Sequence, residues 1–436
     1  MVKKAPMNVY EAAMKRIQYC FSEFDNVLVS FSGGKDSGVL LNLCYEYAKQ
    51  NNLLHKMAVV HMDYEAQYQM TTDYVTATLE RMNDIRRFWL CVPIYAQCAC
   101  RMDAGYWIPW EKSKKDIWCR KMPTYDYVIN EDNKEFEIYK TDTEVPKDFH
   151  RWFVDKYGKT ANVVGIRTQE SYDRLKIIIQ TDHNLRYKGV IWTITTHVNN
   201  KNHGMFTNCY PIYDWKTSDI WIANARFNFS YNRIYDLFYQ AGLTIDQMRV
   251  ASPFHDCGIH TLKLYKVIDP DNWGRMVGRV NGVNFAGLYG GTTAMGWRTI
   301  KLPKGHTWKS YCYFLLSTLD PKLRTHYEKI LATSISYWCE KGGFVAEDIM
   351  PELEALKKDT EYVNAGKSPR YRDQNIIKFA RYPDDCETKS FAKLPSYKRM
   401  CVCIIKNDYF CRYMGFGLTT EAEQRRRKTL EKYRSL

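Results

Sequence analysis

Val-Leu-Val-Ser-Phe-Ser-Gly-Gly-Lys-Asp-Ser-Gly, residues 27–38, is the stretch that decides the fold. Its apolar run at 27–31 predicts a buried strand, and the apolar residues that follow predict a helix beginning near Gly38. The two adjacent glycines allow the connecting turn to point several backbone N–H groups at one place. These free amides and the positive end of the helix dipole attract a phosphate. The stretch therefore predicts a phosphate-binding turn between a strand and a helix.

The spacing within this turn separates it from the Walker A loop, which requires Gly-x-x-x-x-Gly-Lys-Ser/Thr. Ser-Gly-Gly-Lys-Asp-Ser at residues 32–37 instead resembles the PP-loop of the ATP pyrophosphatases. That superfamily includes phosphoadenosine phosphosulfate (PAPS) reductases, GMP synthetase and tRNA sulfur-modifying enzymes. The alternative is a strand–turn–helix corner whose glycines serve geometry alone.

Two further motifs follow in the order that the PAPS reductase-like family shows. Residues 165–171, Gly-Ile-Arg-Thr-Gln-Glu-Ser, follow an apolar strand and resemble the second family signature. In the family its arginine reaches the nucleotide phosphates, and Arg167 offers a bidentate fork suited to that contact. Residues 210–221 resemble the third signature, in which Trp215 and Trp221 anchor a helix start. The chain is thus identified as a member of the PAPS reductase-like family.

A second apolar strand, residues 57–62, ends in Asp63-Tyr64-Glu65. Strand, helix and strand at this spacing predict a right-handed crossover and a parallel sheet. Ligands of such sheets bind at the carboxyl ends of the strands, so we expect Asp63 and Glu65 beside the phosphate loop. There they would hold ribose, a magnesium-bound water or the substrate. The alternative, a polar strand end, stays open for each.

The predicted site draws on these strand ends and on the family resemblance. Its predicted catalytic residues are Lys35, Asp36 and Arg167, and Asp36 is also the predicted Mg²⁺ ligand. The resemblance implies ATP and Mg²⁺ as cofactors, with cleavage between the α and β phosphates and adenylation of an acceptor for sulfur or amine transfer. The predicted nucleotide-binding residues are Ser30, Ser32, Gly33, Gly34, Lys35, Asp36, Ser37, Met62, Asp63, Glu65, Gly165, Arg167, Glu170 and Ser171.

An alternative activity follows from residues 256–260, Asp-Cys-Gly-Ile-His. They resemble the Glu-Cys-Gly-Ile-His element in which PAPS reductases carry their nucleophilic cysteine. The resemblance implies reduction of a sulfonucleotide by Cys257, with His260 or His255 lowering the thiol pKa. Two features depart from the family: the acidic residue is Asp256, and the chain continues to residue 436 instead of ending nearby.

The remaining sequence resembles the long PAPS reductase-like proteins of bacteria and phages. This resemblance rests on residues 248–250 (Met-Arg-Val), 269–273, 279–284 and 395–401. Members often neighbour a ParB-like protein, which implies a third interpretation: a nucleotide-sensing regulator acting with such a partner.

The predicted fold class is α/β, a parallel-sheet adenine nucleotide α-hydrolase-like domain with a mostly helical C-terminal extension. Its expected domains are a PP-loop domain at 1–230 with an aromatic and basic insertion at about 95–150, a helical domain at 231–340, and a helical extension with a basic tail at 341–436.

Composition narrows the class of protein and its partners. A net charge of +14 favours polyanionic partners, tRNA or DNA first. Residues 101–127 interleave aromatic and basic side chains, which indicates either a substrate-facing, base-stacking insertion or a loop anchored by its tryptophans.

The sequence shows no apolar run of membrane-spanning length and no signal peptide, so we expect a cytoplasmic protein. Its 14 cysteines are expected to be reduced thiols, without a zinc or iron–sulfur site. The oligomeric state stays open.

Overall fold

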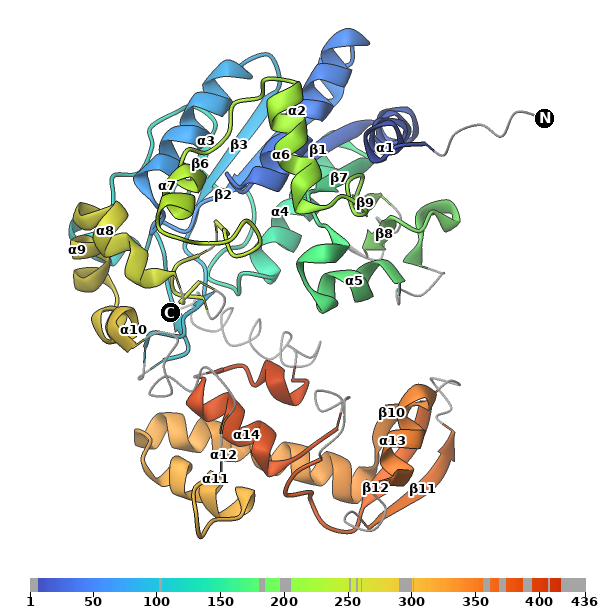
Figure 1. The fold of residues 1–436 in the computed structure, drawn as a ribbon, viewed down its shortest axis with the longest axis vertical. Helices are drawn as coiled ribbons and strands as arrows, with labels where there is room; N and C mark the ends of the chain where they lie inside the picture. The colour runs from blue at the N-terminus through green and yellow to red at the C-terminus, as the bar shows by residue number, and fades with distance from the viewer. Residues whose placement is uncertain are drawn as a thin grey trace. The chain divides into compact units, whose positions relative to one another are not determined.

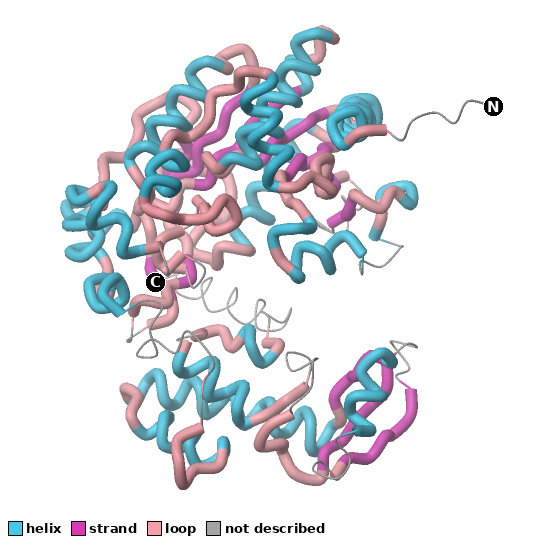
Figure 2. The backbone as a smooth tube through the Cα atoms, in the orientation of Figure 1, coloured by secondary structure: helices cyan, strands magenta, loops and turns pink. Residues whose placement is uncertain are grey.

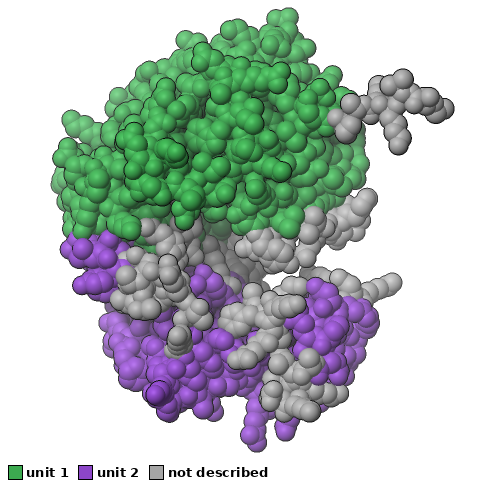
Figure 3. Space-filling view, viewed as in Figure 1, with its two compact units in different colours: residues 1–97, 107–280 green, residues 98–106, 281–436 purple. Residues whose placement is uncertain are grey.

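A computed structural model describes most of the chain as two compact units (Figure 3). The first unit comprises residues 1–97 and 107–280, and the second comprises residues 98–106 and 281–436. The described residues are 7–101, 104–179, 185–196, 205–250, 252–255, 258–259, 261–289, 300, 302–355, 361–367, 374–386, 394–406 and 408–416.

The first unit is built on a seven-stranded sheet with the strand order β6-β3-β2-β1-β7-β9-β8 (Figure 1). Neighbouring strands are parallel except for β8, which pairs antiparallel with β9 at one edge. This arrangement confirms the predicted α/β fold with a mostly parallel sheet. The strands are β1 (Asn26–Ser30), β2 (Met57–Met62), β3 (Arg86–Cys91), β6 (Val128–Asn130), β7 (Thr160–Val164), β8 (Thr193–Thr196) and β9 (Phe206–Cys209).

Helices cover both faces of this sheet because its central strands are apolar on both sides. On one face, α1 (Val9–Glu23) and α6 (Thr217–Arg226) pack on α2 (Lys35–Gln50), which contacts β1 and β2. On the other face, Phe88 of β3 contacts Phe149, which belongs to α4 (Glu144–Tyr157). The unit also contains α3 (Gln69–Arg81), β4 (Ala96–Gln97), α5 (Tyr172–Ile179), α7 (Ile234–Gln240), α8 (Tyr265–Ile268) and α9 (Pro270–Arg279).

The helices between residues 231 and 280 belong to the first unit, whereas the sequence analysis expected a domain boundary after residue 230. The unit continues to Val280 because buried polar contacts tie this segment to the sheet. The Asn232 side-chain amide donates to the Gly33 carbonyl at 3.0 Å, and Arg279 pairs with Glu65 at 2.8 Å. Both contacts join residues that are far apart in the sequence, so the sequence analysis could not predict them.

The second unit is helical, as predicted, and also contains a sheet that the prediction missed (Figure 2). Strands β10 (Gly343–Ala346), β12 (Gln374–Phe379) and β11 (Tyr362–Lys367) pair antiparallel in that order. In β12 every second residue is buried, the pattern of a strand with one face on a core. The helices are α10 (Val283–Tyr289), α11 (Trp308–Ser317), α12 (Pro321–Ile335), α13 (Met350–Ala355) and α14 (Tyr397–Ile405).

A membrane-crossing helix would have to be long and apolar throughout. None of the helices in the described part of the chain has that length and character.

Candidate nucleotide-binding site

The predicted phosphate loop connects the end of β1 to the start of α2. Helix α2 begins at Lys35, three residues before the predicted start, with Gly34 as its N-cap. Gly33 has a φ of +76°, a left-handed conformation that favours glycine, and a Cβ there would stand 2.9 Å from the Val75 side chain. The first backbone amides of a helix have no partner one turn back, so those that follow Lys35, whose own amide donates to the Tyr235 hydroxyl, can be directed at an anion.

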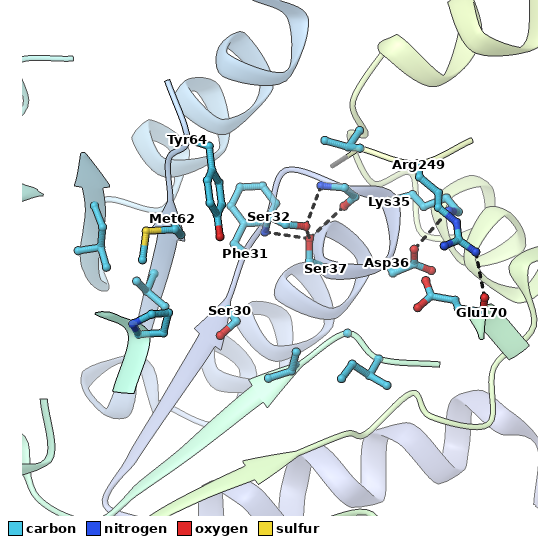
Figure 4. Close-up of a pocket in the computed structure, with 18 of the residues that line it drawn as sticks. Ser30, Phe31, Ser32, Lys35, Asp36, Ser37, Met62, Tyr64, Glu170 and Arg249 are labelled. Carbon is cyan, nitrogen blue, oxygen red and sulfur yellow. Dashed lines mark hydrogen bonds and ion pairs between the residues drawn. The ribbon is translucent and has the colours of Figure 1, made fainter. Parts of the chain in front are cut away.

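Two serine hydroxyls hold this loop closed (Figure 4). The hydroxyl oxygens of Ser32 and Ser37 lie 3.0 Å apart, and the Ser37 hydroxyl donates to the Gly34 carbonyl at 3.2 Å. The Ser32 backbone N–H also donates to the Ser37 hydroxyl at 3.2 Å. The loop is therefore held by hydrogen bonds between its own side chains and backbone.

A cavity of about 460 Å³ opens beside this loop, at the carboxyl ends of the parallel strands. This volume lies within the range of small-molecule sites. Figure 4 shows Met62 and Tyr64 on one side of the loop and Arg249 and Glu170 on the other. The predicted site residues among its lining are Ser30, Ser32, Gly34, Lys35, Asp36, Ser37, Met62, Gly165 and Glu170.

Three cationic side chains line the cavity: Lys35, Arg174 and Arg249. The buried Lys35 ammonium lies 3.2 Å from the Met248 carbonyl oxygen and 3.3 Å from a carboxylate oxygen of Asp36. Burial lowers the pKa of Lys35, and the Asp36 charge opposes that shift. The exposed Arg249 donates to the Glu170 carbonyl at 2.9 Å, and Arg174 pairs with the Glu170 carboxylate. The lining thus carries three cations against the two carboxylates of Asp36 and Glu170, an excess of positive charge that suits an anionic ligand.

Arg167 lies behind the phosphate loop and does not line the cavity. Its side chain is 2% exposed, and its Nε lies 2.5 Å from a carboxylate oxygen of Asp36. The same guanidinium donates to the Thr217 hydroxyl at 3.3 Å, so the second and third motifs meet here. Gly165 lets the segment after β7 approach the first turn of α2, because a Cβ there would stand 3.1 Å from the Ser37 amide nitrogen. In the structure Arg167 therefore positions the loop.

Asp63 and Glu65 are fully buried and lie outside the cavity lining, unlike their neighbours Met62 and Tyr64. Met62 and Asp63 point in opposite directions because they are successive residues at the end of β2, whereas the backbone of Glu65 has left the extended conformation, with a φ of +64°. The sequence analysis expected both residues beside the phosphate loop; in the structure their neighbours Met62 and Tyr64 line the cavity, whereas the two carboxylates do not.

Both carboxylates are used in internal ion pairs. Asp63 pairs with Arg120 and accepts the Trp89 indole N–H at 2.6 Å. Glu65 accepts two bonds from Arg279, at 2.8 and 3.1 Å. These contacts attach the insertion and α9 to the end of β2, and they leave neither carboxylate facing a nucleotide.

Part of the cavity wall is apolar. Met62, Leu90 and Phe149 belong to it, together with His150 of α4. The His150 ring stacks on Phe206 with centroids 4.2 Å apart, and burial lowers the pKa of His150 to about 3. The imidazole is therefore neutral at physiological pH, and this wall suits an uncharged, flat group such as a base.

Sequence reasoning missed several residues of the cavity. The Tyr235 hydroxyl from α7 accepts the Lys35 backbone N–H at 3.0 Å. Tyr235, Phe149, His150 and Arg174 lie in no motif and gave no signal. Arg249 did have a sequence signal, because it is the central residue of the Met-Arg-Val stretch at residues 248–250.

The other predicted site residues have separate outcomes. The Ser171 hydroxyl accepts the Arg174 backbone N–H at 3.3 Å and does not line the cavity. Cys257 and His260 lie outside the described residues. Among the residues that are described, no cluster of three or more histidine, cysteine or carboxylate side chains is arranged to hold a metal.

Two family models match the sequence. The phosphoadenosine phosphosulfate reductase domain matches residues 26–241, and a domain of unknown function (DUF3440) matches residues 242–426. An Escherichia coli K12 protein described as uncharacterized protein YbdN is 31% identical over 428 residues, which cover 97% of this chain and 93% of that protein.

Three solved structures that match the chain are only distantly similar to it. A PAPS reductase from Candida auris is 10% identical, covers 54% of this chain and 94% of its own, and has a TM-score of 0.29. Candida glabrata FMN adenylyltransferase with FMN and an ATP analogue is 15% identical, covers 54% of this chain and 64% of its own, and has a TM-score of 0.30. The U34-tRNA thiolase NcsA from Methanococcus maripaludis is 11% identical, covers 62% of this chain and 78% of its own, and has a TM-score of 0.30.

TM-scores this low support no argument about activity. The sequence matches and the three ordered motifs carry the assignment instead. The chain belongs to the phosphoadenosine phosphosulfate reductase domain family of the PP-loop superfamily, in a long form that continues into the DUF3440 region.

Proposed function

We propose that the cavity binds ATP and that the chain cleaves it between the α and β phosphates, adenylating an acceptor. The observation that carries this proposal is the ordered phosphate loop at the start of α2, opening into a cavity with three cationic side chains. The triphosphate would lie over the loop amides, beside Lys35 and Arg249. The adenine would lie against the apolar wall of Met62, Leu90 and Phe149.

Catalysis in this arrangement is mainly positioning and charge stabilisation. Lys35 and Arg249 would neutralise the charge that develops on the departing pyrophosphate. An acceptor oxygen, nitrogen or sulfur attacks the α phosphorus, its bond to the bridging oxygen breaks, and pyrophosphate leaves with the electron pair. Arg167 acts indirectly by holding Asp36 and the first turn of α2.

The described residues of this cavity do not form a resident Mg²⁺ site. Asp36 is the carboxylate of the phosphate loop, and its two oxygens already contact Arg167 and Lys35. A divalent cation prefers several uncommitted oxygen ligands. Mg²⁺ therefore enters the proposal only as the counterion of ATP in solution.

Product analysis with α-labelled ATP tests the proposal. We expect AMP, or an adenylated acceptor, together with pyrophosphate when the right acceptor is present. Formation of ADP and inorganic phosphate would overturn the cleavage position. Tight ATP binding without turnover under every condition would favour the nucleotide-sensing regulator with a ParB-like partner.

The family match favours sulfonucleotide reduction as the second candidate. In that reaction the Cys257 thiolate attacks the sulfonucleotide sulfur, the nucleotide leaves, and a thioredoxin-like dithiol releases sulfite from the enzyme. Release of sulfite from PAPS by the wild type, and its loss in Cys257→Ser, would establish this candidate.

A further inference from the structure

A second cavity, of about 1050 Å³, lies within the first unit, formed by the insertion and α9. Its volume is more than twice that of the cavity beside the phosphate loop, which we call the nucleotide cavity. It therefore accommodates a ligand larger than a single nucleotide. Its lining includes Lys115, Lys121, Trp118, Tyr125 and Arg275.

The charge of this cavity is positive once internal ion pairs are set aside. Of its carboxylates, Asp132 pairs with Lys112 at 2.7 Å, and Glu131 accepts the Tyr139 hydroxyl at 2.9 Å. Lys115 and Lys121 are exposed, and neither forms an ion pair with another residue that the structure describes. With exposed Arg275, they provide three positive charges against the two carboxylates of Asp116 and Glu131, because the hydrogen bond from the neutral Tyr139 hydroxyl leaves the Glu131 charge in place.

The aromatic side chains of the cavity are held in fixed orientations. Trp118 packs edge-on against the buried Trp110, with centroids 5.1 Å apart, and its indole N–H donates to the Glu111 carbonyl at 3.0 Å. The exposed Tyr125 ring stacks on Tyr127, with centroids 5.0 Å apart and planes within 5°. Fixed aromatic rings beside mobile cationic side chains are the chemistry that binds unpaired bases and their phosphates.

The walls of the two cavities are joined through the end of β2. Arg120 lines the second cavity and pairs with Asp63, which lies between Met62 and Tyr64 of the nucleotide cavity. The Trp110 indole N–H also donates to the Asp63 carbonyl at 2.9 Å. The insertion is thus anchored by its tryptophans and also lined by basic side chains. It has features of both alternatives of the sequence analysis, the anchored loop and the substrate-facing, base-stacking insertion.

We propose that the second cavity binds single-stranded nucleic acid, and that this strand supplies the acceptor for adenylation. The inference rests on the proposed function for its acceptor role, whereas the binding itself is independent of ATP. Unpaired bases are required because stacking on Trp118 and Tyr125 needs an exposed base face.

The test measures binding of fluorescein-labelled oligouridine and oligothymidine to the full chain by anisotropy over a series of salt concentrations, without ATP. The main variant is Lys115→Glu/Lys121→Glu. Its matched control is Lys15→Glu/Lys49→Glu, which makes the same charge change at exposed positions of α1 and α2. A Tyr125→Leu variant removes an exposed ring and leaves the charge unchanged.

We expect the double variant to weaken binding at least about tenfold and to reduce the salt slope by about 1.4, since each phosphate contact contributes about 0.7. The control should retain wild-type affinity. Tyr125→Leu should weaken oligonucleotide binding and leave heparin binding unchanged.

Equal losses in the double variant and its control would overturn the site. Tighter binding of duplex than of single strands would overturn the ligand. If either result came with intact α,β-cleavage of ATP, the inference would fail while the proposed function stood. If single strands bound as expected but ATP were not cleaved between the α and β phosphates, the binding site would stand and the proposed function would fail.

Discussion

Nε of Arg167 lies 2.5 Å from a carboxylate oxygen of Asp36, so the arginine of the second motif holds the phosphate loop of the first. Arg167 follows the carboxyl end of β7, and Asp36 lies in the first turn of α2, which follows the neighbouring parallel strand β1. The contact makes the loop geometry dependent on a residue that does not face the cavity. Because only Arg249 lines the cavity, we expect replacement of Arg167 and replacement of Arg249 to have opposite effects on stability and on ATP affinity.

Replacing Arg167 by alanine should destabilise the fold by about 3 kcal/mol, because it removes one partner of a buried ion pair. Its guanidinium is 2% exposed and also donates to Thr217, so no water replaces these bonds easily. Chemical denaturation of the wild type and variant measures the difference. An unchanged free energy of unfolding would show that the pair is not structural.

Replacing Arg249 by alanine should have the opposite profile. This side chain is exposed and has one described hydrogen bond, to the Glu170 carbonyl. The free energy of unfolding should change by less than about 0.5 kcal/mol, whereas ATP affinity should fall about tenfold through loss of a charge-assisted phosphate contact. Calorimetric titration with ATP and with adenosine separates the two contributions. An equal loss for adenosine would contradict a phosphate role.

Gly33→Ala should distort the phosphate loop, because its φ of +76° is unfavourable for alanine and the added Cβ would approach Val75 to 2.9 Å. We expect a loss of about 1–3 kcal/mol in unfolding free energy, accompanied by weaker ATP binding. Gly274→Ala in α9 is the matched control, since a Cβ there meets open space and alanine favours helix by about 1 kcal/mol. Wild-type ATP affinity in Gly33→Ala would refute the preformed loop.

Acid should weaken the fold through Asp63. Burial raises the pKa of this carboxyl, but the Arg120 guanidinium and the Trp89 N–H outweigh burial and hold it below the ordinary value of 3.8. A folded pKa below the unfolded pKa stabilises the protein above the unfolded pKa, and this stability is lost as the pH falls through the folded pKa. The free energy of unfolding should therefore decrease on acidification below about pH 4.

The variant Asp63→Asn/Arg120→Met tests this origin of the acid sensitivity. It removes both charges together, so no buried charge is left unpaired. Its free energy of unfolding should depend less steeply on pH in the acid range than that of the wild type. Identical slopes would assign the acid sensitivity to other carboxylates.

Local sequence predicted much of the nucleotide-binding unit. Strands β1, β2 and β7 match the apolar runs, and the phosphate loop lies at the glycine pair that predicted it. Both predictions succeeded because apolar periodicity and turn chemistry are local properties of the sequence. The roles of Asp63 and Glu65 were beyond such reasoning, since their partners Arg120 and Arg279 lie 57 and 214 residues away.

The missed C-terminal sheet has a similar cause. Strand β11 is mostly exposed and carries no alternating apolar pattern, so its pairing with β12 defines it as a strand. The alternation within β12 itself, which buries Ile377 and Phe379, was a usable signal. A strand identified only by its partner is invisible to a single-sequence reading.

Exchange of radiolabelled pyrophosphate into ATP tests the central claim most directly, because it requires reversible cleavage between the α and β phosphates. The assay compares the wild type with Lys35→Ala, and with Lys49→Ala at the exposed far end of the same helix as the control. It is run with Mg²⁺, with and without single-stranded RNA, single-stranded DNA and duplex DNA. We expect exchange in the wild type and in Lys49→Ala, stimulated by single strands, and its loss in Lys35→Ala. Absence of exchange under every condition, or its persistence in Lys35→Ala, would contradict the account.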